Sequence, residues 1–180
     1  AWGMTETSRA IQKCRLPRDP AGRALGYPRD PLEVLVVDEF DKSVSSGTPG
    51  ELLVRCLGEN PRHGFFSGYL KQPEETEKAW RGGWFHTGDV VIQRSDGMLS
   101  FVDRKKNIIR RSGENIAAAE VEEALIENST IQSIAVLAIK DDFHDEEIHA
   151  CIVLMPNNSK TEMIANLIFE FGRNKLISYK

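Results

Sequence analysis

The spacing of apolar and polar residues changes near residue 104, and this change divides the chain into two predicted parts. Upstream, short apolar runs of strand length alternate with glycine- and proline-rich turns, which is typical of an antiparallel β-meander. Residues 8–31, with scattered Pro, Gly and Arg, predict a loop with one short strand. Proline at the opening position and acids in the first turn predict a short helix over residues 72–80. The predicted strands are residues 32–38, 51–56, 84–85, 90–92 and 98–102.

Downstream, the pattern predicts a small unit of mixed helices and strands. A hairpin over residues 108–116, turning at Ser112-Gly113, is followed by a helix, two strands separated by an acidic loop at 141–147, and a last helix that begins at Thr161. The predicted fold class is therefore α+β: a β-rich part over residues 1–103, then a small α+β domain over 104–180 with a hairpin, a short antiparallel sheet and helices. The expected elements after the hairpin are a helix at 117–127, strands at 131–139 and 148–155, and a helix at 161–172.

Composition adds exclusions rather than a function. The chain has 180 residues and a net charge of −4, which argues mildly against a nucleic-acid binder. No apolar run is long enough to span a bilayer, so we expect no stable membrane insertion and a cytoplasmic protein. Cys14, Cys56 and Cys151 are far apart and odd in number, which predicts buried reduced thiols rather than a disulfide frame or a zinc site.

One candidate site centres on Asp89, which follows Thr87-Gly88 directly. The two oxygens of a carboxylate can accept hydrogen bonds from both hydroxyls of a ribose, and we expect such an aspartate at a strand end beside glycine. His86 is expected to shape this turn. Arg104 supplies a fixed fork of donors for ribose or phosphate oxygens. Taken singly, Thr-Gly-Asp also fits a plain β-turn, and the basic run from Arg104 also fits a solvated rim.

A second group of candidates lies at the start of the sequence. Trp2 offers a flat face for a base, Thr5 a hydroxyl for a phosphate, and Glu6 a hard oxygen ligand for Mg²⁺. The alternative interpretation is that Thr5 and Glu6 cap a helix.

The order of these motifs is more specific than any one of them. Together they resemble the adenylate-forming superfamily, which includes acyl-CoA synthetases, luciferases and peptide-synthetase adenylation domains. Within it, the motifs RKKN, RSGEN and EVE in residues 104–122 and the loop at 138–147 resemble the carnitine/crotonobetaine-CoA ligase branch. The motifs are WGMTET, GELLVR, GYLKQPEET, GGWFHTGD and DGMLSFVDRKKNIIRRSGENIAAAEVEEAL, and they extend over nearly the whole chain.

The resemblance implies an acid-thiol ligase that uses ATP, Mg²⁺ and coenzyme A to activate a small carboxylic acid, in fatty acid or carnitine metabolism. It implies that Trp2 stacks on adenine, that Thr5 contacts phosphate, that Glu6 binds Mg²⁺, that Asp89 holds the ribose diol, and that Arg104 assists at ribose or phosphate. Of these, Thr5, Glu6 and Arg104 would be the catalytic residues.

The resemblance also assigns roles in the second part of the chain. Lys106 falls at the hinge about which a mobile C-terminal domain swings between the two steps. Ser112, Gly113 and Glu114 would form the face that lines the coenzyme A tunnel.

The family's phosphate loop and acid pocket are absent from this sequence, and so is the stretch that carries its catalytic adenylation lysine; Lys175 and Lys180 do not take that role. We therefore expect the C-terminal portion of a longer ligase, unable to make an adenylate alone. The alternative is a stand-alone, non-catalytic module that binds a nucleotide or a partner protein. Strands without their parent sheet would leave an apolar surface through which the chain could self-associate.

Overall fold

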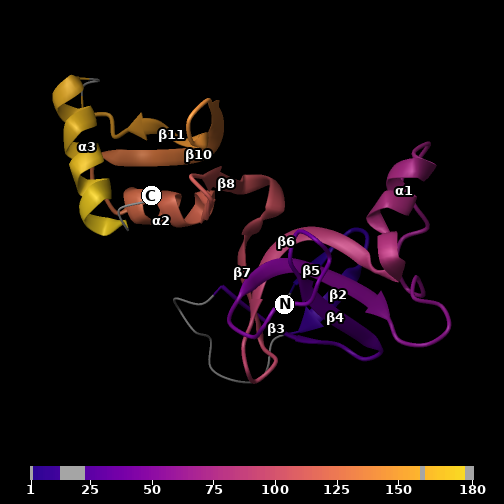
Figure 1. Ribbon diagram of the computed structural model, residues 1–180. Helices are drawn as coiled ribbons and strands as arrows, with labels where there is room; N and C mark the ends of the chain where they lie inside the picture. The colour runs from indigo at the N-terminus through magenta and orange to yellow at the C-terminus, as the bar shows by residue number, and fades with distance from the viewer. Residues whose placement is uncertain (1, 13–22, 159–160, 177–180) are drawn as a thin grey trace. The chain divides into compact units, whose positions relative to one another are not determined.

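The computed structural model describes residues 2–12, 23–158 and 161–176, and it separates into two compact units (Figure 1). Unit 1 is Ala1–Lys105 and unit 2 is Lys106–Lys180. This division lies two residues after the boundary predicted at 103/104. Antiparallel sheets combined with three helices confirm the predicted α+β class.

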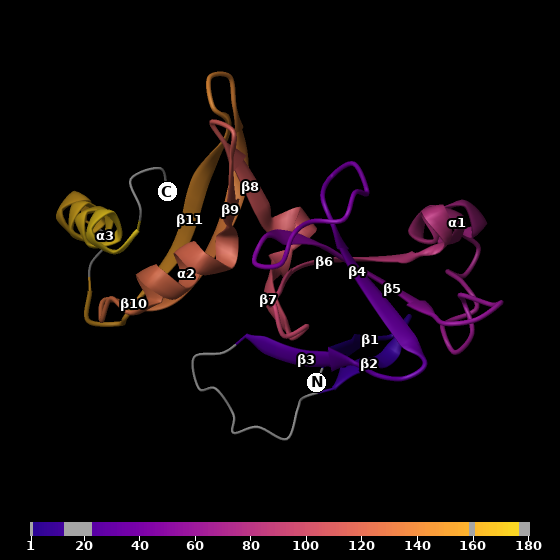
Figure 2. The same cartoon turned by 60° about the horizontal axis from the view of Figure 1, so that its bottom comes forward.

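Unit 1 is built on one curved sheet of seven strands in the order β1-β2-β3-β7-β6-β5-β4, with every neighbouring pair antiparallel (Figure 2). Side chains alternate between the two faces of the sheet, as along β6, where every second residue from Phe85 to Val91 is buried, including the polar Thr87 and Asp89. The strands are β1 (Trp2–Met4), β2 (Ser8–Gln12), β3 (Ala24–Pro28), β4 (Leu32–Val37), β5 (Pro49–Cys56), β6 (Phe85–Gln93) and β7 (Leu99–Arg104).

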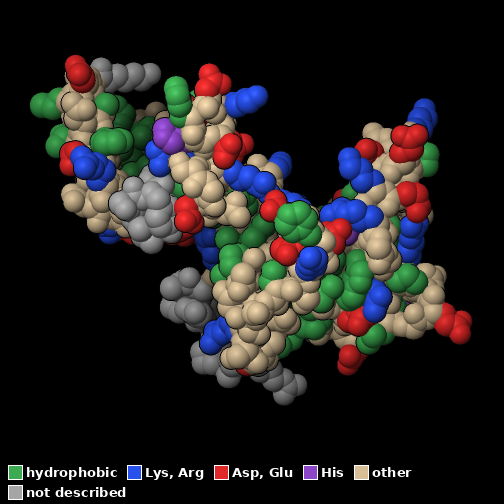
Figure 3. Space-filling model, viewed as in Figure 1, with side chains coloured by type: hydrophobic (Ala, Val, Ile, Leu, Met, Phe, Trp, Pro, Cys, Tyr) green, Lys and Arg blue, Asp and Glu red, His purple; other side chains and the backbone are tan. Residues whose placement is uncertain are grey.

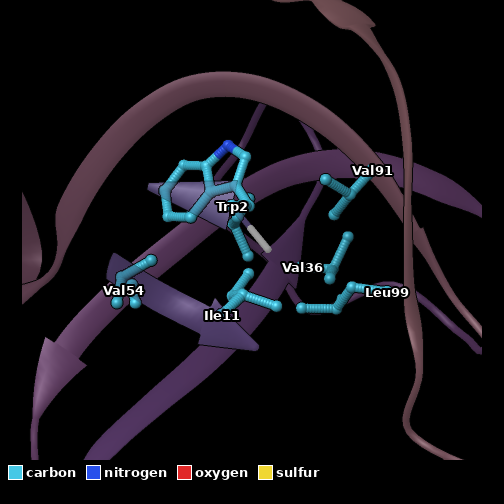
Figure 4. Packing of buried hydrophobic residues seen from close by; sticks show 8 residues of the cluster. Trp2, Ile11, Val36, Val54, Val91 and Leu99 are labelled. Carbon is cyan, nitrogen blue, oxygen red and sulfur yellow. The ribbon is translucent and has the colours of Figure 1, made fainter. Parts of the chain in front are cut away.

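The core of unit 1 collects one side chain or two from most of these strands. Figure 4 shows the Trp2 ring among Ile11, Val36, Val54 and other aliphatic residues, all of which are buried. A separate aromatic cluster joins the helix α1 (Pro73–Ala79) to β6, where the Trp80 and Phe85 rings lie 5.4 Å apart. Most strands of unit 1 therefore pack against a common hydrophobic interior.

Two sequence predictions for unit 1 were wrong. Residues 8–31 contain two strands, β2 and β3, instead of a loop with one. The β2 strand pairs with β1 and β3, and β3 also pairs with β7 far along the chain. The strands predicted at 84–85 and 90–92 are not separate: Phe85 and residues 90–92 belong to the single strand β6, which runs through Thr87-Gly88-Asp89, and Trp84 lies just before it.

Unit 2 combines a four-stranded sheet, in the order β10-β11-β8-β9, with two helices. Helix α2 (Ala118–Ile126) packs along the sheet, and α3 (Glu162–Lys175) packs on α2 (Figures 1 and 2). The core includes Ile109, Ile116, Val121 and Ile168, and it shares no residue with the core of unit 1. The strands are β8 (Ile108–Arg111), β9 (Glu114–Ala117), β10 (Ile131–Asp141) and β11 (Asp145–Leu154).

The sequence predicted unit 2 well, with two corrections. The acidic loop at 141–147 is shorter than expected, because β10 and β11 stay paired until Asp141 and Asp145. Cys56 is buried as predicted, but Cys151 is exposed on β11, and Cys14 lies outside the described residues. The predicted cap of the last helix is confirmed, since the Thr161 hydroxyl accepts a hydrogen bond from the Ile164 N–H.

The surface carries both signs of charge. On the face shown in Figure 3, acidic and basic side chains lie intermixed along α1, without a large patch of one sign. Apolar side chains are exposed on α3, where Met163, Leu167 and Phe169 are 57–68% accessible. No helix within the described ranges is long and apolar enough to cross a membrane.

Candidate functional site

The candidate site in unit 1 is centred on the Asp89 carboxylate, whose side chain is 2% exposed. Its Oδ2 accepts a hydrogen bond of 2.7 Å from the indole Nε1–H of Trp2. Its Oδ1 lies 2.8 Å from Nε of Arg104 but accepts no hydrogen bond from any described residue. The structure therefore brings together three of the residues predicted from sequence, and one buried carboxylate oxygen of Asp89 has no hydrogen bond from the described residues.

A bulge in β6 determines where Asp89 points. The β5 and β6 strands pair at Glu51/Val90 and again at Leu53/His86, so three residues of β6 lie opposite Leu52 alone. The Thr87 hydroxyl bridges the gap, donating to the Leu52 carbonyl at 2.7 Å and accepting from the Asp89 N–H at 3.1 Å. Such bulges re-aim side chains. Asp89 thus lies inside a strand, and neither the expected strand end nor a plain turn is found there.

Gly88 takes the backbone conformation that this bulge needs. Its φ is +69°, in the left-handed region that glycine adopts without strain. A Cβ at this position would meet nothing within 4 Å, so there is space for a side chain. Within the protein, the backbone angle is therefore what favours glycine here.

The charges around Asp89 oppose one another. Burial raises the pKa of Asp89, and the nearby Glu51 charge adds to that effect, whereas the Trp2 hydrogen bond and the Arg104 charge lower it. The net pKa lies above the ordinary value of 3.8. Asp89 consequently remains costly to ionise, and a ligand that donates a hydrogen bond to it would relieve part of that cost.

The residues predicted at the start of the chain lie in the turn between β1 and β2. Thr5 is exposed, and the Glu6 carboxylate accepts a hydrogen bond of 3.0 Å from the Tyr69 hydroxyl. Neither residue caps a helix. Among the residues that the structure describes, no hydrogen bond or ion pair joins Thr5 or Glu6 to Asp89.

Trp2 is more enclosed than the resemblance suggested. Its side chain is only 9% exposed, and its ring packs in the core (Figure 4). In this structure the indole N–H of Trp2 donates a hydrogen bond to Asp89, and little of the face of the indole ring is accessible to a base. Stacking of Trp2 on adenine remains a prediction.

In unit 2, the predicted coenzyme A face is the tip of a tight hairpin. Ser112, Gly113 and Glu114 are exposed, and φ is positive at both turn residues, Ser112 (50°) and Gly113 (82°), as in the two-residue turns that suit hairpins. The Ser112 N–H donates to the His144 carbonyl at 3.0 Å. Arg111 forms an ion pair with Glu147, which helps to hold the hairpin on β11. Lys106 is exposed and begins unit 2.

Sequence reasoning missed a buried carboxylate next to the Asp89 bulge. The Glu51 side chain is 5% exposed, and Lys105 Nζ lies 2.6 Å from its Oε2. His86 Nδ1 is buried without a hydrogen bond, 3.5 Å from the same oxygen. The available signal was an acidic residue at the start of an otherwise apolar strand, GELLV.

No family model matches the chain. A crotonobetaine/carnitine-CoA ligase of Proteus mirabilis is 32% identical over 181 residues, which cover 100% of this chain and 34% of the relative. The chain thus spans about a third of the length of the curated relatives it matches.

Solved structures agree with this similarity. The ATP-bound RpMatB-BxBclM chimera B1 matches with a TM-score of 0.83 and 26% identity, over 99% of this chain and 34% of that one. The anthranilate CoA ligase AuaEII with anthranoyl-AMP matches with a TM-score of 0.79 and 25% identity, over 99% and 33%. By sequence and by fold, the chain belongs to the adenylate-forming superfamily and corresponds to its C-terminal portion.

Proposed function

We propose that this chain is part of an ATP-dependent acyl-CoA ligase that activates a small carboxylic acid in two steps. Its similarity to named CoA ligases supports this, as does its fold, which is shared with structures that hold ATP or an acyl-adenylate. In this proposal, unit 1 carries the ribose end of the nucleotide site and unit 2 carries the thioester-forming face. The reaction would serve carnitine or fatty acid metabolism in the cytoplasm.

The observation that carries the proposal is the free oxygen of Asp89. Because Oδ2 already accepts from Trp2, a ribose hydroxyl would donate to Oδ1, which accepts no hydrogen bond from the described residues. Oδ1 is covered in this structure, so the half-exposed Arg104 side chain beside it would have to move aside. Arg104 lies beside it with 45% of its side chain exposed, so its remaining N–H groups can reach a ribose or phosphate oxygen. A carboxylate acceptor, Asp89, next to a guanidinium donor, Arg104, suits a ligand in which a sugar hydroxyl lies next to a phosphate.

In the first step, the substrate carboxylate attacks the α-phosphate of ATP, forming an acyl-adenylate and releasing pyrophosphate. Arg104 would stabilise the negative charge that develops, and the Thr5 hydroxyl would donate to a phosphate oxygen. Glu6 fits Mg²⁺, because this cation commonly takes one or two carboxylates together with substrate phosphates. When bound, Mg²⁺ would neutralise phosphate charge.

In the second step, the thiol of coenzyme A attacks the acyl carbonyl carbon and AMP leaves. The hairpin tip would line the path of the thiol, with Ser112, Gly113 and Glu114 exposed toward it. Lys106, the first residue of unit 2, would be the hinge between the two steps.

Titration of the chain with AMP tests the nucleotide site. We expect AMP to bind more tightly than 2′,3′-dideoxy-AMP, which lacks the ribose hydroxyls and is otherwise the same ligand. Equal affinities, or no binding of AMP, would overturn the assignment of Asp89. We also expect no pyrophosphate release when the chain is incubated with ATP, Mg²⁺ and a carboxylic acid; release would contradict the predicted inability to adenylate alone.

A further inference from the structure

Glu51 is a buried carboxylate that contacts both segments from which the ribose-binding residues come. It lies on β5 with 5% of its side chain exposed. Its Oε1 accepts a hydrogen bond of 3.2 Å from the Gly88 N–H, and its Oε2 accepts one of 2.6 Å from Lys105 Nζ. Gly88 directly precedes Asp89, and Lys105 directly follows Arg104.

The first contact acts on the bulge. In the three-residue bulge of β6, the Gly88 N–H does not pair with β5 by the regular ladder, and the Glu51 carboxylate accepts it instead. The hydrogen bond holds Gly88 at its positive φ and thereby helps to set the direction in which the Asp89 side chain leaves the strand.

The second contact acts on the end of β7. Arg104 pairs with Asp89 across the ladder, and its own side chain is half exposed. The Glu51–Lys105 ion pair fixes the residue that follows, where the strand passes into the short helix at Lys105–Asn107. Glu51 thus limits movement on both sides of the Asp89–Arg104 pair.

The charges around Glu51 favour a role in holding the neighbouring backbone over a role as a metal ligand. Asp41, Glu51 and His86 lie close enough together to ligate a cation. However, Arg81 pairs with Asp41 at 3.2 Å, and Lys105 pairs with Glu51, so both carboxylates are already neutralised. A divalent cation there would have to displace two basic groups.

We propose that Glu51 is a positioning residue of the nucleotide site, one oxygen fixing the bulge that aims Asp89 and the other fixing the end of β7 beside Arg104. This proposal rests on the proposed function for the identity of the ligand, AMP. The contacts of Glu51 with Gly88 and Lys105 are present without that ligand. Glu51 does not contact the nucleotide; it acts through Gly88 and Lys105.

The test compares Glu51→Gln, Glu51→Leu and Lys105→Met in the full chain, with Glu33→Gln as the matched control. Glutamine can still accept from Gly88 but loses the charge that holds Lys105, whereas leucine loses both contacts. Glu33 is a carboxylate on β4 of the same sheet, and it forms an ion pair with Arg55 on the neighbouring strand, β5. The Trp2 indole N–H resonance reports the Asp89 carboxylate directly, and AMP titration reports the site.

We expect the indole resonance to shift in both Glu51 variants and to stay unchanged in Glu33→Gln. AMP affinity should fall by roughly tenfold in Glu51→Gln, the size of effect typical of residues that orient a ligand's direct partners, and by more in Glu51→Leu. Because Glu51→Gln already removes the ion pair between Glu51 and Lys105, adding Lys105→Met to it should cost no further affinity.

An unchanged indole resonance in Glu51→Gln overturns the inference, and so does an AMP affinity equal to that of the unaltered chain. If the unaltered chain binds no AMP, the proposed nucleotide site fails, and the indole resonance alone then decides whether Glu51 positions Asp89. Should Glu51→Leu fail to fold, Glu51→Gln and Lys105→Met still supply both readouts.

Discussion

Replacing Asp89 by asparagine separates what this carboxylate does for binding from what it does for stability. The substitution turns the 2.7 Å bond from Trp2 into a neutral one, worth about 1 kcal/mol instead of about 1.5–3. It also removes the ion pair with Arg104, worth only about 0.2–1 kcal/mol because the Arg104 side chain is 45% exposed. The interactions lost therefore total about 1–3 kcal/mol.

Relief of the buried charge offsets this loss. Enclosing an ionised carboxylate costs several kcal/mol even after relaxation, and the raised pKa of Asp89 means that its partners do not fully repay the cost of burial. We therefore expect Asp89→Asn to change the free energy of unfolding by less than about 1 kcal/mol at pH 7. Breaking a typical buried ion pair costs about 3–5 kcal/mol.

The sign of the pH dependence follows from the same shift. Because the folded-state pKa of Asp89 lies above its unfolded value, near 3.8, its contribution to stability is fully present below that value and is lost as the pH rises through the folded pKa. The unaltered chain should thus gain stability relative to Asp89→Asn as the pH falls over this interval.

Urea unfolding followed by tryptophan fluorescence measures the stability, and AMP calorimetry measures the binding. Loss of the charged acceptor should weaken AMP by about tenfold, equivalent to about 1.4 kcal/mol. Asp38→Asn, which alters a carboxylate that caps the turn at Phe40 and Lys42, is the control and should leave AMP affinity unchanged. A loss of stability clearly above about 1 kcal/mol would mean that relief of the buried charge does not offset the lost contacts. That result, or unchanged AMP binding, would refute the reasoning.

Three further predictions concern individual side chains. Ile116→Ala, at a fully buried position, should lower the stability of unit 2 by about 2–5 kcal/mol. Amide exchange measures this loss, because all three tryptophans lie in unit 1 and their fluorescence would not report on unit 2. Amide protection equal to that of the unaltered chain would contradict the prediction. Gly88→Ala should cost about 1–2 kcal/mol through its backbone angle alone, so a loss above about 4 kcal/mol in urea unfolding would mean a clash. The His86 imidazole should titrate below pH 6.5 by NMR, because burial and the Arg81 charge lower its pKa. The stability linked to neutral His86 is therefore fully present above pH 6.5 and is lost as the pH falls through the folded-state pKa. A titration midpoint above 6.5 would contradict the prediction.

The parts of the fold that the sequence predicted are those determined by local residues. The hairpin turn needs only the two residues Ser112-Gly113, which adopt positive φ, and the last helix needs only a hydroxyl at Thr161 before an amphipathic repeat. By contrast, β3 has no distinctive local pattern and is a strand because β7, some 75 residues later in the sequence, pairs with it.

The candidate site shows the same limit. Asp89, Arg104 and Trp2 could be predicted because their order along the chain matches a known family. Glu51 could not, because its role depends on a bulge whose two sides lie 37 residues apart, and nothing local to GELLV indicates which backbone N–H it will meet.

Among the described residues, the side chains that contact Asp89 or its bulge belong to unit 1. The Trp2 indole on β1, the Glu51 carboxylate on β5 and the Arg104 guanidinium on β7 all act before residue 106, where the second unit begins. In the proposed two-step reaction, the acyl-adenylate must stay bound after pyrophosphate has left, until the thiol of coenzyme A attacks it and AMP leaves. The proposed ribose site would meet this need, because the described contacts that fix its acceptor lie within unit 1. Variants of the hairpin tip, at Ser112 for example, should accordingly leave AMP affinity unaltered.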